Sequence, residues 1–328
     1  MTVLVTGVTG FTGGQLARYL GRQGFRVRGL VRTSSQARGL DLEAENIIHV
    51  VGDLTDRASL DSACRDIEIV YHIAASYRSA GQTDDAYRAV NVTGTSNLLQ
   101  AAQAAGVRRF VHCSTGGVHG HVEHPPASED APLEPGDIYQ VTKLEAECLA
   151  RETGAQTDLD VVVVRPIGIY GPGDMRFLKM FRGVARGRFP MLGSGNVFYH
   201  LTYIDDLVEG FLLCGETPEA AGRTYILAGP SYSTLNELIA LIATELDVSP
   251  SRLHFPVWPV WLLGAVCEGV CVPLGVEPPL YRRRVEFFTK SRAFDTTRAR
   301  TEIGWDPKVD LVRGISKTVV WYKEQGLL

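Results

Sequence analysis

The sequence predicts an α/β protein whose parallel sheet is covered by helices on both faces. Short apolar, β-branched segments alternate with segments of helical period over residues 1–165. A glycine-rich turn joins the first apolar segment to the first helical one. The run VVVVR at 161–165 is continuously apolar up to its arginine, which is typical of a strand buried on both faces of a parallel sheet.

The elements follow one another in a regular order. We expect strands at 2–6, 26–31, 47–51, 67–73, 109–113 and 161–165. The first helix follows the glycine turn through Leu16, Ala17 and Leu20, and a short one covers 57–64. Longer helices are expected at 84–105 and 137–153, because Gly106 and Gly154 stand where stop signals belong.

The regular pattern ends after Pro166. Glycine-rich turns at 171–174 and 193–195 and scattered prolines break the remaining chain into short pieces. We therefore expect a smaller, mixed C-terminal substrate lobe made of residues 166–199 and 229–328. Residues 1–165 form the larger domain, with 200–228 returning to its sheet.

Composition limits the class of protein. The 328 residues carry a formal charge of −4, with 45% hydrophobic and 21% charged residues, which is typical of a folded globular chain. This balance gives no electrostatic reason to expect a nucleic-acid partner. Six cysteines without C-x-x-C spacing, and an N-terminal apolar run too short for a signal peptide, predict a cytoplasmic protein. The apolar stretch 257–275 contains Pro259, Glu268 and Pro273, so we expect no integral membrane span.

The glycine turn indicates a nucleotide site. Gly7, Gly10 and Gly13 allow a sharp turn, close approach to a pyrophosphate and close packing of helix on strand. The helix N-terminus, at Phe11 and Thr12, offers free N–H groups to an anion. In this strand–turn–helix context the glycines predict a Rossmann-type dinucleotide-binding domain.

Arg32 stands at the end of the second predicted strand, 22 positions after Gly10. An acidic residue there would accept a hydrogen bond from a ribose 2′-hydroxyl, whereas a guanidinium can donate two hydrogen bonds to a 2′-phosphate. We therefore expect NADP, with NAD possible; the alternative is that Arg32 only lines a solvated edge.

Small and acidic residues end the next two strands. Asp53, followed by Leu54, is predicted either to bind the adenine amino group or to cap the following turn. Ala74 and Ala75 are small enough to let a cofactor lie against the backbone, or simply allow close packing.

The pair Tyr139 and Lys143 is the most informative feature. At i and i+4 on a helix the two side chains share a face, and a neighbouring ammonium favours the phenolate. Such a pair can give or take the proton of a secondary alcohol while hydride leaves the carbinol carbon. A hydroxyl at the end of the fifth strand, in Ser114 or Thr115, can hold the substrate oxygen.

Together these motifs resemble the extended branch of the short-chain dehydrogenase/reductase family. The resemblance runs nearly end to end, through GVTGFTGG, GDLTD, HIAA, NVTGTSNLL, CSTGGVHG, YQVTK, RPIGIYGPGD, YIDD and IGWDPK. It implies Tyr139 as acid/base, Lys143 as its partner and ribose ligand, and Thr115, rather than Ser114, as the substrate-oxygen donor. It also implies that Pro166 and Ile169 line the nicotinamide. Asn91 lies near the cofactor in similar proteins, or else fixes the backbone of its helix. The family further suggests a homodimer through helices 84–105 and 137–153.

Departures from the family pattern favour one subgroup. Thr115 is followed by Gly116-Gly117 instead of the Asp-Glu of sugar dehydratases. Gly168 and Tyr199 stand where nucleotide-sugar epimerases commonly carry Asn and Arg. The apolar segment 255–288 resembles the 3β-hydroxysteroid dehydrogenase and dihydroflavonol-reductase-like members. Alternatively, this segment is core or a dimer contact. A peripheral membrane role, aided by the arginines at 282–284, is less favoured. We expect no metal site.

The resulting hypothesis is an NAD(P)-dependent oxidoreductase that interconverts a secondary alcohol and a ketone on a bulky, apolar ring substrate. The first alternative is a sugar or nucleotide-sugar epimerase that retains its NAD(P). The second is a non-catalytic dinucleotide-sensing protein.

Overall fold

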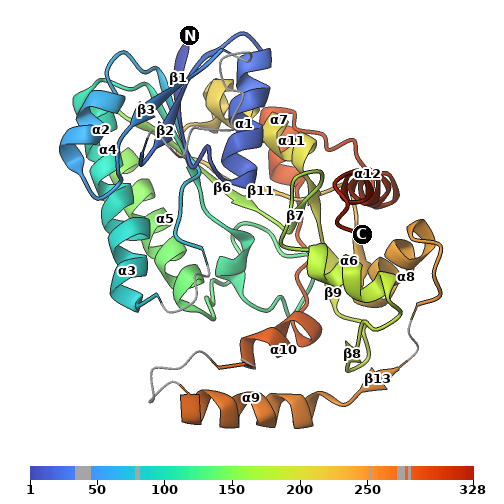
Figure 1. The fold of residues 1–328 in the computed structure, drawn as a ribbon. Helices are drawn as coiled ribbons and strands as arrows, with labels where there is room; N and C mark the ends of the chain where they lie inside the picture. The colour runs from blue at the N-terminus through green and yellow to red at the C-terminus, as the bar shows by residue number, and fades with distance from the viewer. Residues whose placement is uncertain (34–45, 78–81, 251–252, 272–277, 280–281) are drawn as a thin grey trace.

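A seven-stranded parallel sheet forms the centre of the computed structural model (Figure 1). The structure describes residues 1–33, 46–77, 82–250, 253–271, 278–279 and 282–328. The strand order is β11-β6-β5-β4-β1-β2-β3, which confirms the Rossmann-type α/β fold. The strands are β1 (Thr2–Thr6), β2 (Arg26–Val31), β3 (Ile47–Val51), β4 (Ile69–His72), β5 (Arg109–Cys113), β6 (Asp160–Pro166) and β11 (Thr224–Leu227).

Helices cover both faces of the sheet because every central strand buries both sets of side chains. On β1, Val3 and Val5 pack with the core residues of α1 (Phe11–Arg22) and α7 (Ile204–Glu216). Leu4 points to the opposite face, which is covered by α2 (Arg57–Ala63), α4 (Gly94–Ala104) and α5 (Ile138–Gln156). Figure 1 shows α1 and α7 on one side of the sheet and α2, α4 and α5 on the other.

Most predicted boundaries agree with the structure, and two helices differ. The helix expected at 84–105 is divided into α3 (Asp84–Arg88), the π-helical turn η3 (Ala89–Thr93) and α4. The prediction that Gly154 ends the other helix is wrong, because α5 continues to Gln156. A Cβ on Gly154 would lie 2.8 Å from Cβ of Val161, so this glycine allows helix and strand to pack closely.

The chain after β6 builds short two-stranded pairs and peripheral helices. The pairs are β7 (Ile169–Tyr170) with β10 (Thr202–Tyr203), β9 (Phe198–His200) with β12 (Tyr232–Thr234), and β8 (Met191–Leu192) with β13 (His254–Phe255). The helices are α6 (Leu178–Ala185), α8 (Leu235–Glu245), α9 (Val257–Cys271), α10 (Arg282–Thr289), α11 (Thr297–Ile303) and α12 (Leu311–Glu324). Among the helices that the structure describes, none combines the length and apolarity that crossing a bilayer requires.

The C-terminal segment is tied to the sheet as well as to these peripheral elements. Trp305 is fully buried, lies against Gly210 of α7, and donates from Nε1 to the carbonyl oxygen of Asp206 at 2.9 Å. The Asp206 carboxylate accepts the backbone N–H groups of Lys308 (3.1 Å) and Val309 (2.9 Å). The division of the chain into two lobes at the predicted boundaries stays a prediction.

Candidate active site

A cavity of about 1270 Å³ lies at the carboxyl ends of the central strands. This is the edge of a doubly wound sheet where ligands bind. Two of the predicted site residues, Lys143 and Asn91, lie behind its wall instead of on its surface. The predicted residues that line it are Gly7, Gly10, Phe11, Thr12, Gly13, Arg32, Asp53, Leu54, Ala74, Ala75, Thr115, Tyr139, Pro166 and Ile169.

The glycine turn packs tightly against its own backbone, because two of its residues have no space for a side chain. Gly7 has a φ of +75°, and a Cβ on it would lie 2.9 Å from the backbone nitrogen of Ala74. A Cβ on Gly13 would lie 2.3 Å from the carbonyl oxygen of Gly7. Gly10 is the N-cap residue of α1 and has no side chain that could accept a hydrogen bond from the N–H groups of the first turn. This cradle fits the pyrophosphate of a dinucleotide.

Arg32 and Asp53 both reach the cavity edge expected for an adenosine moiety. Asp53 Oδ1 accepts from Thr55 N at 2.8 Å and from Thr55 Oγ1 at 2.7 Å. These two hydrogen bonds, helped by the positive charge of Arg32, hold the pKa of Asp53 below its usual value. Asp53 therefore does cap the turn after β3, whereas Asp56 caps α2 by accepting from Ala58 N at 3.1 Å.

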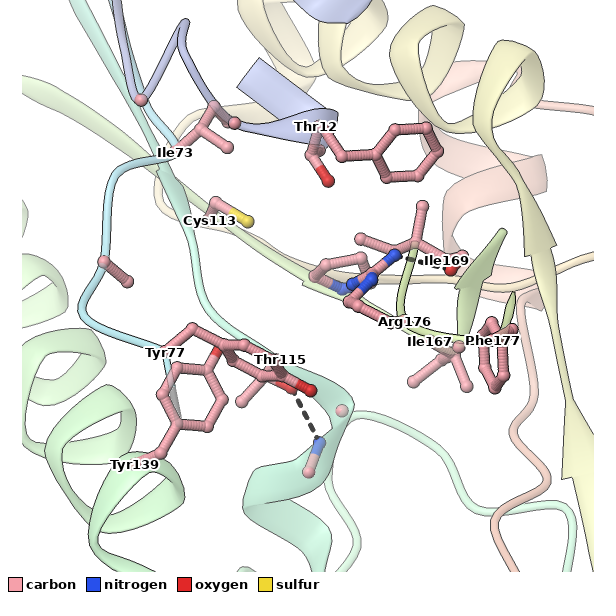
Figure 2. Close-up of a pocket in the computed structure, with 18 of the residues that line it drawn as sticks. Thr12, Ile73, Tyr77, Cys113, Thr115, Tyr139, Ile167, Ile169, Arg176 and Phe177 are labelled. Atoms are coloured by element: carbon pink, nitrogen blue, oxygen red, sulfur yellow. Dashed lines mark hydrogen bonds between the residues drawn. The ribbon is translucent and has the colours of Figure 1, made fainter. Parts of the chain in front are cut away.

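Tyr139 and Thr115 face the same space from neighbouring elements (Figure 2). Tyr139 lies in the first turn of α5, which begins where Asp137 Oδ1 accepts from Gln140 N at 2.9 Å. Its ring packs edge-on against that of Tyr77, with centroids 4.9 Å apart. Thr115 follows β5, and its Oγ1 accepts from Gly117 N at 3.1 Å, which fixes the hydroxyl beside the cavity.

Lys143, one helical turn after Tyr139, is almost completely buried, and this burial lowers the pKa of its ammonium. Two buried histidines lie near it, His72 on β4 and His112 on β5. Burial, and then the charge of Lys143, lowers the pKa of His72 to about 3 and that of His112 well below its usual value. Both imidazoles are therefore neutral near neutral pH. The His72 ring nitrogens contact Thr6 Oγ1 and Thr95 Oγ1, each at 2.9 Å.

Asn91 lies inside the π-helical turn η3 and joins two segments near the site. Its Oδ1 accepts from Ser76 N at 2.7 Å, and its Nδ2 donates to Ser76 O at 3.2 Å and Thr142 Oγ1 at 3.0 Å. These contacts fix the backbone after β4 against α5. Contact between Asn91 and a cofactor stays a prediction.

The sequence analysis missed a buried ion pair directly behind the site. Glu147 and Arg165 form this pair, and Glu147 Oε2 accepts from Arg165 Nε at 3.1 Å and from Ser114 Oγ at 2.6 Å. Ser114 also lines the cavity, but its hydroxyl donates its proton to Glu147. The role of Thr115 as substrate-oxygen donor stays a prediction. The i+4 spacing of Glu147 after Lys143 indicated that both lie on one face of the helix, but no sequence signal identified Arg165 as the partner of Glu147.

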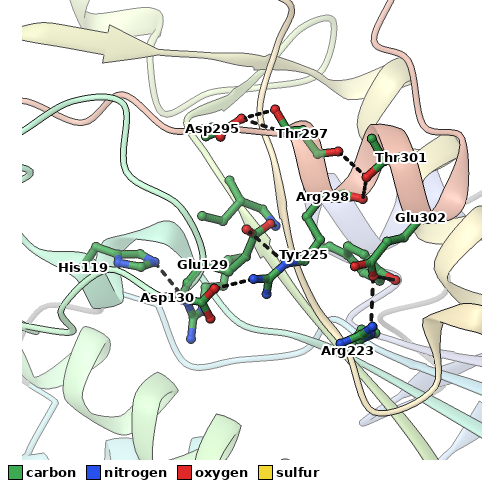
Figure 3. Close-up of polar contacts among 12 residues, drawn as sticks. His119, Glu129, Asp130, Arg223, Tyr225, Asp295, Thr297, Arg298, Thr301 and Glu302 are labelled. Carbon is green, nitrogen blue, oxygen red and sulfur yellow. Dashed lines mark hydrogen bonds and ion pairs between the residues drawn. The ribbon is translucent and has the colours of Figure 1, made fainter.

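Arg165 also anchors the long loop after β5. Its Nη1 donates to Glu129 O at 2.8 Å and contacts His119 Nε2 at 3.0 Å. Figure 3 shows the continuation of this network, in which Arg298 pairs with Glu129 and Asp130. Glu129 Oε1 in turn accepts the backbone N–H of Ile226 at 2.9 Å. The network ties β6 and the edge strand β11 to the loop that carries Thr115 toward α5.

The other half of the cavity is largely aromatic. Its apolar wall includes Phe177, Met180, Phe189, Phe287 and Phe288. Three basic residues also line it, namely Lys179, Arg188 and Arg292. The cavity therefore combines a broad apolar surface with several positive charges.

Arg176 was not foreseen from the sequence. Its Nη2 donates to Ile169 O at 2.7 Å, and its guanidinium carbon lies 5.4 Å from the centre of the Phe11 ring. This contact brings the loop after β7 next to the glycine turn (Figure 2). Arg176 Nε also pairs with the buried carboxylate of Asp174, two positions earlier, at 2.5 Å. No sequence pattern marked the two contacts that bring Arg176 to the cavity, with a distant aromatic ring and a backbone carbonyl.

The chain has relatives of more than one activity. It is 32% identical over 330 residues to a putative dihydroflavonol 4-reductase of Synechocystis sp., with 98% of this chain and 94% of that protein covered. It is 31% identical over 342 residues to the UDP-glucose 4-epimerase of Mycolicibacterium smegmatis, with 99% and 100% covered. It is 28% identical over 349 residues to 3beta-hydroxysteroid-dehydrogenase/decarboxylase isoform 1 of Arabidopsis thaliana, with 96% and 78% covered.

Solved structures and a family model agree with these likenesses. The structure of MoeE5 in complex with UDP-glucose and NAD superposes with a TM-score of 0.78 at 25% identity, covering 99% of each chain. Residues 3–228 match the model of the NAD dependent epimerase/dehydratase family. The predicted resemblance to the extended short-chain dehydrogenase/reductases is thereby confirmed, and the chain belongs to the NAD-dependent epimerase/dehydratase family.

Proposed function

We propose that the protein interconverts a secondary alcohol and a ketone on a bulky, apolar ring substrate, with a nicotinamide dinucleotide as redox partner. The observation that carries this proposal is that Thr115, Tyr139, the glycine turn and a wall of phenylalanines all line one cavity. The similarity to proteins described as a dihydroflavonol reductase and a steroid dehydrogenase supports the substrate class.

The residues divide into binding and proton-transfer roles. The glycine turn would hold the pyrophosphate, with Ala74, Ala75, Pro166 and Ile169 against the remainder of the dinucleotide. When bound, the dinucleotide supplies the group that accepts or gives the hydride. Arg32 favours NADP over NAD, because a guanidinium can pair with a 2′-phosphate.

Tyr139 is the proposed acid/base. Its phenol would donate a proton to the carbonyl oxygen during reduction and take it back during oxidation, while the Thr115 hydroxyl holds that oxygen. The buried Lys143 ammonium stabilises the phenolate electrostatically from the next turn of α5. Because His72 and His112 are neutral, they add no positive charge that would compete with Lys143.

Turnover of free NADPH with a panel of apolar cyclic ketones, followed at 340 nm, tests the proposal. Tyr139→Phe should lower kcat by about 10²–10⁴-fold while leaving the dissociation constant of NADPH unchanged. Tyr232→Phe, an exposed tyrosine on β12, serves as the matched control and should keep full activity. Undiminished kcat in Tyr139→Phe would refute the assigned role.

A specific observation favours a second candidate. Lys179, Arg188 and Arg292 give the substrate half of the cavity positive charge, which suits a nucleotide diphosphate. A nucleotide-sugar epimerase would use the same proton transfer with a retained dinucleotide. Cofactor that survives purification, and isomerisation of a UDP-sugar without net change at 340 nm, would decide for this function. Dinucleotide binding without turnover of either substrate class would instead indicate a sensing protein.

A further inference from the structure

The helix α9 exposes an apolar face to solvent at the edge of the molecule. Its large apolar side chains are exposed, so the interpretation of this segment as buried core does not hold for α9. Figure 1 shows α9 lying apart from the sheet, with α10 beside it. The exposed fractions are 69% for Trp258, 48% for Trp261, 51% for Leu262, 59% for Leu263, 57% for Val266 and 56% for Val270.

The polarity of α9 is opposite to that of a helix on a water-exposed surface. Its only charged residue, Glu268, is turned toward α10 and is 19% exposed. There its Oε2 pairs with Arg282 Nε at 2.6 Å, and its Oε1 accepts from Arg282 N at 2.7 Å. The charge is thus neutralised on the protein side, and the apolar residues are left on the outer side.

The length of α9 determines how it can contact a membrane. Fifteen residues at about 1.5 Å each span roughly 22 Å, less than the ~30 Å hydrocarbon core of a bilayer. A helix of this length therefore lies along the interface. Trp258 and Trp261 suit that position, because indole rings favour the headgroup level.

The charge around α9 favours an anionic surface. Residues 251–292 contain six basic and three acidic residues, a formal charge of 6 − 3 = +3, although the whole chain carries −4. Three of the basic residues are the consecutive arginines that begin α10. Arg282 is half-exposed, and its guanidinium carbon lies 5.7 Å from the centre of the Trp261 ring. The side chains of Arg283 and Arg284 lie outside the described residues.

We propose that the exposed face of α9 docks the protein on the surface of a bilayer containing anionic phospholipid. The apolar face enters the headgroup–acyl boundary, where the net positive charge of residues 251–292 attracts anionic lipid and Arg282, half-exposed beside Trp261, lies at the level of the lipid phosphates. In α10, Phe287 and Phe288 line the cavity, so the same helix joins the docking face to the proposed substrate site. The docking itself does not depend on the proposed catalytic function.

Flotation of the full-length protein with phospholipid vesicles tests the docking. Vesicles of phosphatidylcholine mixed with phosphatidylglycerol should carry the protein upward, whereas pure phosphatidylcholine should carry less. Replacing three exposed side chains, in Trp258→Ser/Leu262→Ser/Val266→Ser, should lower the partition coefficient by about tenfold or more. Val312→Ser/Val320→Ser is the matched control, because these α12 residues are each 51% exposed and lie outside the docking face.

A second measurement does not depend on a heavily substituted variant. Lipids brominated along the acyl chain should quench the tryptophan fluorescence of the wild-type protein, and Trp258→Phe/Trp261→Phe should abolish the quenching. The buried Trp305 should not respond. Absence of both flotation and quenching would overturn the proposal. The proposal would also be overturned if the wild-type protein does not bind vesicles and sediments as a dimer, while the triple variant sediments as a monomer. That result would mean that α9 joins two copies of the chain.

Discussion

Replacing Glu147 by glutamine should destabilise the protein strongly. The Glu147 and Arg165 side chains are 0% and 2% exposed, and the carboxylate accepts two guanidinium hydrogen bonds and that of Ser114. Glu147→Gln would leave the guanidinium charged and buried without an anionic partner. Removing one member of a buried pair costs about 3–5 kcal/mol, so we expect a loss of that size in the free energy of unfolding.

Urea unfolding followed by circular dichroism measures this loss. The control is Asp61→Asn, which breaks the exposed pair of Arg57 and Asp61, and should cost no more than about 1 kcal/mol. The double variant Glu147→Leu/Arg165→Met removes both buried charges and should recover most of the stability lost in Glu147→Gln. A Glu147→Gln protein as stable as the Asp61→Asn control would refute the reasoning, as would a double variant less stable than Glu147→Gln.

Three further changes have definite expected results. Gly13→Ala should abolish dinucleotide binding in calorimetry, because its Cβ would overlap the Gly7 carbonyl, whereas Gly269→Ala, with nothing within 4 Å, should bind normally. Arg32→Ala should weaken NADP(H) more than NAD(H); an equal effect on both dissociation constants would exclude a 2′-phosphate contact. The folded protein keeps His72 neutral down to about pH 3, but the unfolded chain takes up a proton near pH 6.5, so stability must fall as the pH drops below 6.5. For this one side chain the loss is about 2 kcal/mol at pH 5, and His72→Gln should reduce the pH dependence of urea unfolding by that amount.

The sheet and the cofactor half of the site follow from local sequence patterns. Short apolar runs bounded by turns predict the first three strands and β5 at their observed residues. The central strands are buried on both faces, whereas β3, at the edge of the sheet, is largely exposed. The glycine turn was predictable because only glycine fits beside Ala74 and the Gly7 carbonyl. Tyr139 and Thr115, the two residues to which the family resemblance assigns proton transfer and the substrate oxygen, both line the cavity.

Long-range contacts explain what the sequence did not reveal. Gly154 has the appearance of a helix stop, but the close approach of Val161 keeps it inside α5. Asp53 was predicted either to bind adenine or to cap the turn after β3, and it does cap that turn by accepting from the backbone N–H and the hydroxyl of Thr55. Contact with adenine stays a prediction. The apolar residues of α9 are those typical of a protein core, yet they are exposed. Their exposure depends on how the C-terminal elements pack on the rest of the chain, which local sequence does not determine.

In the π-helical turn at Ala89–Thr93, the number of residues matters for the position of Asn91 as much as the identity of the residues does. A regular helix advances about 100° per residue, so losing Val92 or Thr93, which lie between Asn91 and α4, would rotate Asn91 against that helix. The amide would then turn away from Ser76 and Thr142 although every side chain involved was still present. A single-residue deletion in this stretch should therefore be more damaging than most substitutions in it, and relatives that keep this turn should preserve its spacing.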